Sequence, residues 1–252
     1  MLAATALVAT TVDASPERGL EIAQEADARN QGWGDTESLA RMVLRNKAGK
    51  ESVRQMRIKS LEVQTDGDKG IVVFDEPKDI RGTALLTHSH KVGDDDQWLY
   101  LPAVKRVKRI ASRNKSGPFM GSEFSFEDLS SQEVEKYTYN LVREDELNGE
   151  KIYVLERFPV DKNSGYTKQV AYLDQAELRI HKVEYYDRKK SHLKTLDLKD
   201  YRLYLDKYWR PHTLDMVNHQ TGKSTTLSWE KIDFQTGARD GDFTEAALRR
   251  MR

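Results

Sequence analysis

The chain has 252 residues, of which 41 are basic and 41 are acidic, so its formal net charge is zero. Nucleic-acid-binding domains usually carry a basic excess, and we therefore expect no nucleic-acid partner. The absence of cysteine excludes disulfides, a thiol nucleophile and cysteine-ligated zinc. The length suits one large β domain, and no repeat or linker divides the chain, so we expect a single domain over residues 15–252.

The N-terminal segment has the pattern of an export signal. An apolar run from Leu2 to Val12 is followed by Val12-Asp13-Ala14 and then by Ser15-Pro16. Small or β-branched residues in this spacing are typical of a signal-peptidase site, so residues 1–14 are interpreted as a signal peptide remnant that is cleaved after Ala14. The alternative is a loosely packed tail. The run is far shorter than the ~20 residues that a membrane-spanning helix needs.

A helix is expected from Ser15 to Asn30, with Ser15 as its N-cap and Pro16 at the first helical position. Alternating polar and apolar residues then predict strands up to Phe234, and a short helix from Thr244 to Arg250 closes the chain. The Asn148-Gly149 pair predicts a type I′ hairpin turn. About eleven strands joined by short turns indicate a mainly β fold with helices, an antiparallel meander curled into an open or closed barrel. The expected strands are 38–45, 53–63, 71–74, 83–89, 97–101, 137–143, 151–158, 169–173, 179–185, 193–203, 211–217 and 225–234.

No sequence motif of a hydrolase, metalloprotease, nucleotide-binding or dinucleotide-binding protein is present. We therefore expect no catalytic residue, no enzymatic activity and no cofactor. His88 and His90 share one strand face, and Asp94-Asp95-Asp96 follows, which is compatible with a metal site. A solvated acidic turn explains the triplet better, and we predict no metal ion.

A basic cluster consists of Lys105, Arg106, Lys108 and Arg109. In a strand, Arg106 and Lys108 share one face and Arg109 lies on the other. Such a cluster suits contact with lipid headgroups, an anionic membrane surface or a protein partner. Equally, basic residues on an edge strand protect a sheet against self-association.

A glycine- and serine-rich segment after Pro118 carries large apolar side chains that must be buried somewhere: Phe119, Met120, Phe124 and Phe126. The segment either fills the protein's own core or covers a cavity, where Met and Phe adapt to flexible acyl chains. In the second case Glu123, Glu127 and Asp128 would face the basic cluster and hold this lid closed. Trp98 and Tyr100 belong to a set of strand aromatics that either line the cavity or reflect β propensity.

Four segments together resemble the outer-membrane lipoprotein-sorting family, the LolA-like periplasmic carriers, and in particular the branch encoded beside efflux-type transporters. The segments are 81–86 (RGTALL), 98–102 (WLYLP), 106–110 (RVKRI) and 119–129 (FMGSEFSFEDL).

The resemblance implies a half-open antiparallel β-barrel around helices, with an apolar cavity for acyl chains. It also implies a periplasmic location and partners that include lipoprotein acyl chains or lipid, an inner-membrane transporter and, transiently, an anionic membrane surface. On this reading the ligand is shielded by Trp98, Tyr100 and the four apolar residues of the 119–126 segment. The basic cluster then contacts a membrane partner or lipid headgroups. A lipid-sensing module with the same fold is the alternative to a carrier.

Overall fold

The computed structural model describes residues 14–250 of the chain. The signal-peptide interpretation rests on residues 1–14 and so lies almost wholly outside the described residues. The first element is helix α1 (Pro16–Arg29). Its cap is the predicted one, because the Ser15 hydroxyl accepts a hydrogen bond from the Arg18 backbone N–H at 3.2 Å. In the described residues no helix is long and apolar enough to cross a membrane.

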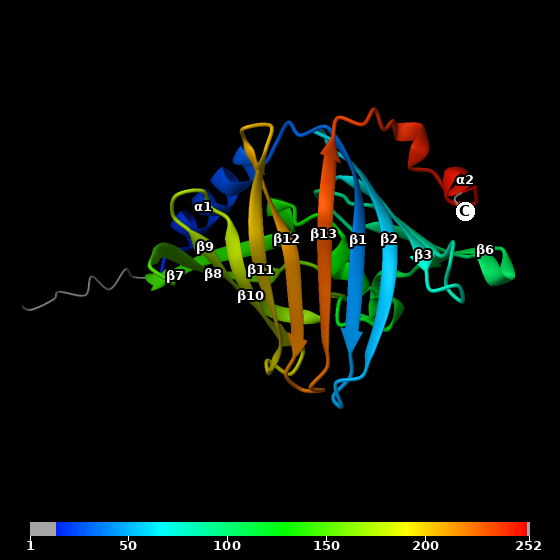
Figure 1. Ribbon diagram of the computed structural model, residues 1–252. Helices are drawn as coiled ribbons and strands as arrows, with labels where there is room; N and C mark the ends of the chain where they lie inside the picture. The colour runs from blue at the N-terminus through cyan, green and yellow to red at the C-terminus, as the bar shows by residue number, and fades with distance from the viewer. Residues whose placement is uncertain (1–13, 251–252) are drawn as a thin grey trace, which may run out of the picture.

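Thirteen antiparallel strands form one strongly curved sheet (Figure 1). Their order across the sheet is β6-β5-β4-β3-β2-β1-β13-β12-β11-β10-β9-β8-β7, so the first and last strands pair at the centre and neither edge is closed. The strands are β1 (Asp35–Arg45), β2 (Glu51–Leu61), β3 (Lys69–Glu76), β4 (Ala84–His88), β5 (Asp96–Leu101), β6 (Arg106–Ile110), β7 (Tyr137–Leu147), β8 (Glu150–Pro159), β9 (Tyr166–Asp174), β10 (Ile180–Asp187), β11 (His192–Tyr204), β12 (Tyr208–Asn218) and β13 (Ser224–Phe234).

The half-open antiparallel barrel is confirmed, with thirteen strands in place of about eleven. Among the thirteen, β6 is the one without a counterpart in the twelve expected ranges, and it is a five-residue strand whose cations obscure the alternation. The hairpin turn at Asn148-Gly149 has positive φ at both residues, 54° and 85°, as a type I′ turn requires. The closing helix is α2 (Glu245–Leu248), capped by Thr244 as expected but shorter.

Six short 3₁₀ helices lie in the loops of the described chain, four of them between β6 and β7. They are η1 (Pro102–Val104), η2 (Ser112–Asn114), η3 (Phe119–Gly121), η4 (Phe126–Leu129), η5 (Val134–Lys136) and η6 (Asp240–Asp242). We call residues 117–131 the plug. In Figure 1 the plug and α1 lie behind the sheet, inside its curve, whereas α2 lies at its outer side.

The plug fills the larger hydrophobic core, which it shares with the concave face of the sheet. Phe119 is 1% exposed, and its ring lies 5.6 Å from that of Phe74 on β3. Helix α1 contributes Ile22 to the same core. A smaller core lies on the outer face, where Phe243 and Leu248 cover β3 and β4.

Helix α1 lies directly against the edge strand β7. Backbone hydrogen bonds join Ser15 and Leu141 in both directions, at 3.1 and 3.0 Å. One turn later, a Cβ atom on Gly19 would lie 2.7 Å from the Leu141 nitrogen, so only glycine permits this approach. The close packing holds α1 across the concave side and so defines one wall of the space described next.

Candidate functional site

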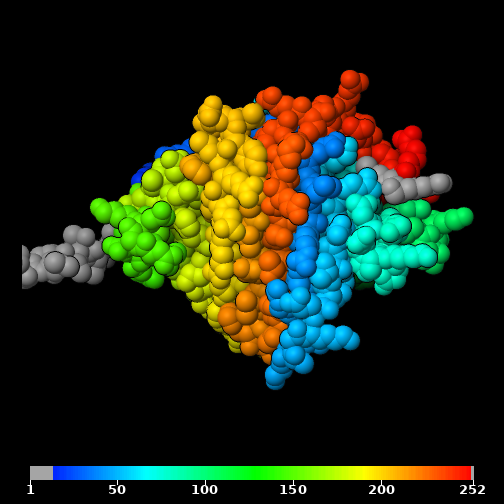
Figure 2. Space-filling view, in the orientation of Figure 1, coloured from blue at the N-terminus to red at the C-terminus, as the bar shows by residue number. Residues whose placement is uncertain are grey.

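A cavity of about 1020 Å³ lies between the concave face, α1 and the end of the plug. Ligand pockets in proteins commonly measure ≈ 300–1,000 Å³, so the space is large enough for a substantial ligand. The side chains of β11, β12, β13, β1 and β2 form a continuous wall on the outer face (Figure 2). The cavity therefore lies behind this wall, on the concave side.

Part of the cavity wall is apolar because each strand turns every second side chain inward. Helix α1 adds Ala23 and Ala26, and the plug adds Leu129. The strands contribute Ile58, Leu155, Ala171, Leu173, Ile180, Leu198, Trp229 and Ile232.

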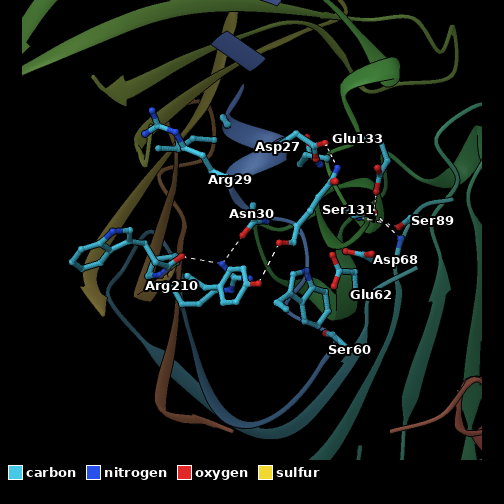
Figure 3. Close-up of a pocket in the computed structure, with 18 of the residues that line it drawn as sticks. Asp27, Arg29, Asn30, Ser60, Glu62, Asp68, Ser89, Ser131, Glu133 and Arg210 are labelled. Atoms are coloured by element: carbon cyan, nitrogen blue, oxygen red, sulfur yellow. Dashed lines mark hydrogen bonds between the residues drawn. The ribbon is translucent and has the colours of Figure 1, made fainter. Parts of the chain in front are cut away.

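One side of the cavity is acidic. Figure 3 shows Glu62, Asp68 and Glu133 beside Ser89 and Ser131. Burial, reinforced by the neighbouring carboxylates of Glu133 and Glu62, raises the pKa of Asp68 to about 6. Ser131 ties this side to the sheet, because its backbone N–H donates to the Ser89 hydroxyl at 2.9 Å.

A cation stands elsewhere on the cavity wall. Arg210 of β12 donates from Nη1 to the Asn30 Oδ1 at the end of α1, at 2.6 Å (Figure 3). Burial lowers the pKa of Arg210 below its ordinary value. The Tyr208 hydroxyl likewise donates to the Gln31 carbonyl at 3.2 Å. These two hydrogen bonds attach the end of α1 to β12.

Comparisons with known proteins agree with this architecture. The crystal structure of an outer membrane lipoprotein-sorting protein domain from Vibrio parahaemolyticus has 60% sequence identity and a TM-score of 0.92, covering 93% of this chain and 100% of that one. This chain belongs to the outer membrane lipoprotein-sorting protein family. The resemblance to a lipoprotein-sorting family that the sequence motifs indicated is confirmed, whereas the branch encoded beside efflux-type transporters stays a prediction.

Two further solved structures are similar to this chain. A DUF1329 family protein from Desulfovibrio piger has 29% identity and a TM-score of 0.87, covering 94% of this chain and 100% of that one. A LolA superfamily protein from Nitrosomonas europaea has 21% identity and a TM-score of 0.74, covering 91% and 98%, and shows the shared fold. A protein family described as "Uncharacterized protein" matches residues 66–250. Among curated proteins, no sequence matches the chain.

Within the LolA-like fold, Trp98 and Tyr100 lie on the outer face of β5. They pack against the smaller core with Val107 and Phe243, whereas Leu99 between them joins the larger core. Neither Trp98 nor Tyr100 lines the cavity of about 1020 Å³. Alternation shows that the two aromatics share a face, but the sequence does not say which face is concave.

The four apolar plug residues also lie apart from the cavity lining. Phe119 and Phe124 are buried in the larger core, and Met120 and Phe126 pack against it. The cavity instead meets the plug at its end, at residues 128–131. The geometry thus corresponds to the first of the two readings, a segment that fills the protein's own core.

The acidic residues of the plug do not face the basic cluster. The Asp128 carboxylate lies 2.6 Å from the Lys194 Nζ of β11, and the two side chains are only 6% and 4% exposed. Glu127 accepts hydrogen bonds from the Ser164 hydroxyl at 2.8 Å and from the Gly165 N–H at 2.9 Å. Burial and the adjacent Asp128 raise the pKa of Glu127. The expected latch was wrong: the acids fasten the plug to the opposite half of the sheet.

The basic cluster lies on and beside β6, the free edge of the sheet. Lys105, Arg106, Lys108 and Arg109 are all exposed, and Arg109 forms an ion pair with Asp96. Arg106 and Lys108 lie opposite Leu101 and Leu99 in the register, and Arg109 lies opposite Trp98. The predicted division between two faces is therefore correct, and both the docking and the edge-protection readings stay predictions.

The histidines have separate partners. His88 Nε2 lies 2.7 Å from the Phe243 carbonyl, and His90 Nδ1 lies 2.7 Å from Asp66 Oδ2. Within the described residues, one group with metal-ligand geometry is Glu150, Asp174 and His181. Arg179 Nε already donates to Asp174 Oδ2 at 2.8 Å, so the Asp174 carboxylate is already paired with a cation of the protein itself.

Arg157 is the cavity residue that the sequence reading missed. It lies on β8 and lines the cavity, yet is only 8% exposed. The strand 151–158 had been expected, and alternation places Arg157 on the same face as Leu155. An arginine in line with the core residues of a strand was the signal that could have identified it.

Proposed function

We propose that the chain is a periplasmic carrier that holds acyl chains of lipoproteins or lipids in the cavity and passes them between membrane partners, including an inner-membrane transporter. The observation that carries this proposal is the cavity of about 1020 Å³ with apolar walls from β2, β8–β11, β13 and α1. Burial of each methylene contributes ~0.8 kcal/mol, so one acyl chain of ordinary length would be held firmly. Membership of a lipoprotein-sorting family supports the same ligand class.

Helix α1 provides a direct test of the cavity. Ala26 lines the cavity and Ala28 does not, although both lie on the same helix. We expect Ala26→Trp to weaken binding of a fluorescent acyl probe by about tenfold or more, because the indole occupies ligand space. Ala28→Trp, on the exposed side, is the control and should bind normally. Equal binding by both variants would place the ligand elsewhere.

Carriage, as opposed to binding, requires a second measurement. Native mass spectrometry of the purified protein should show a copurified lipid or acyl chain, and the loaded protein should transfer it between vesicles. A protein that keeps its lipid and instead changes its affinity for a membrane partner would be the sensing module. A protein that contains no lipid and takes none up would contradict both.

A further inference from the structure

Arg157 is a buried cation without a counter-ion. Within residues 14–250, no carboxylate lies at ion-pair distance from its guanidinium, and its Nε has no hydrogen-bond partner. An unpaired charge removed from water is strongly disfavoured, and such groups are normally paired or coordinated. The side chain borders the cavity, so a ligand there is able to supply the missing partner.

The surroundings of Arg157 compensate its charge only in part. The Tyr137 ring lies 5.3 Å from the guanidinium carbon, a cation–π contact. The Tyr137 hydroxyl donates to the Gln132 Oε1 at 2.6 Å. No carboxylate takes part in these contacts, and a ring face satisfies none of the guanidinium N–H groups.

Other unpartnered polar atoms gather around the same site. Among the described residues, five buried side-chain atoms lack a hydrogen-bond partner, and three of them belong to Arg157, Gln169 and Ser130. Gln169 lies directly opposite Arg157 in the β8–β9 register, and Ser130 lines the cavity with Arg157. Two of these unpaired groups, those of Arg157 and Ser130, border the cavity, and Gln169 lies beside Arg157 on the neighbouring strand.

We propose that Arg157 binds the oxyanion, a carboxylate or a phosphate, of an amphiphilic ligand whose chain lies along the apolar walls. The guanidinium is planar and presents paired donors that match a carboxylate or phosphate in two parallel hydrogen bonds. A small hydrophilic anion would leave the apolar walls uncovered, and a neutral chain would leave the cation unpaired. This inference rests on the proposed function and specifies the ligand class as anionic amphiphiles.

The test compares ligands that differ only in their head group. Palmitic acid, hexadecyl phosphate and hexadecanol would each displace a fluorescent acyl probe from the purified chain. We expect the unaltered protein to bind at least one of the two anions about tenfold or more tightly than hexadecanol, as charge-assisted hydrogen bonds in a buried site imply. Which of the two anions binds more tightly then shows whether the site prefers a carboxylate or a phosphate head group.

Two arginine variants locate the effect. Arg157→Met keeps the apolar stem and should abolish the preference for anions, so that the two anions bind no more tightly than hexadecanol. Arg157→Lys should retain part of the preference. Arg54→Met is the matched control: Arg54 also has an unpartnered buried nitrogen and lies 5.6 Å from the Phe74 ring, but it does not line the cavity.

The possible failures are distinguishable. If the unaltered protein binds the three ligands equally, or if Arg157→Met keeps the preference for anions, the inference about Arg157 is wrong and the carrier proposal stands. If none of the three ligands binds, the carrier proposal itself fails. The preference is measured first in the unaltered protein, so it does not depend on the folding of any variant.

Discussion

Two charged regions of this molecule differ in almost every physical respect. Lys194 and Asp128 form an ion pair whose side chains are 4% and 6% exposed, and Lys194 Nζ also donates to the Glu123 carbonyl at 2.9 Å. The basic cluster on β6 is exposed to solvent along the sheet edge. The comparison teaches that the buried pair fixes the plug, whereas the exposed cations contribute little to stability and are accessible to a partner.

The largest expected effect follows from breaking the buried pair. Lys194→Met leaves the Asp128 carboxylate uncompensated in the core, which should cost about 3–5 kcal/mol of unfolding free energy. Urea unfolding followed by circular dichroism would measure it. The control is Lys199→Met on the same strand, whose pair with Asp215 has side chains 54% and 29% exposed and should contribute at most about 1 kcal/mol. Similar costs for the two variants would remove the distinction between buried and exposed charges.

An intermediate effect is expected from Asp68, near the end of the plug. Its folded pKa of about 6 exceeds the unfolded value of about 3.9, so this carboxyl stabilises the fold fully below pH ~4 and the contribution is lost as pH rises through ~6. We expect the unfolding free energy to fall by about 3 kcal/mol over this window because of Asp68, since each unit of pKa difference corresponds to about 1.4 kcal/mol.

The measurement is the difference between the unaltered chain and Asp68→Asn, since other groups titrate in the same window. Asn resembles the protonated acid, so the variant should lack this part of the slope. Glu146→Gln, at an exposed position near the end of β7, should keep the slope of the unaltered chain. An Asp68→Asn curve parallel to the unaltered one would show that Asp68 is ionised normally.

The smallest effect on stability is expected at the sheet edge. Reversing Arg106 and Arg109 to Glu should change the unfolding free energy by no more than about 0.5 kcal/mol. Under the docking reading, the same change should weaken association with anionic vesicles while sparing a neutral acyl probe. That association should also decline with salt, which screens charges over ~10 Å at 0.1 M ionic strength.

A matched charge reversal separates a local from a general effect. Lys47 and Lys50 are exposed in the turn between β1 and β2, far from β6 in the strand order. Lys47→Glu with Lys50→Glu changes the net charge equally and should leave vesicle association nearly intact. If both double variants behave alike, or if salt has no influence, the basic cluster only protects the edge strand.

The sequence predicted the parts of the fold that local chemistry determines. Ser15 and Pro16 identified α1, and the Asn148-Gly149 pair identified a hairpin. The Lys194–Asp128 pair could not be predicted in this way, because its members are 66 residues apart and a lysine in an alternating strand is expected to face solvent. Arg157 was overlooked for the same reason, since a single sequence does not reveal which face of a strand is enclosed.

The central pairing of β1 with β13 has a consequence for how the chain folds. It brings Thr36 opposite Phe234, whereas most other neighbours in the sheet are successive along the chain. During synthesis the meander from β1 to β6 is complete long before β13 exists. Until then β1 pairs only with β2, and its other edge has no partner strand. Such distant pairings form slowly, because the chain loses the entropy of closing a long loop before the stabilising contacts form. A chain that ended before β13 would therefore expose a long strand edge, which is a template for aggregation.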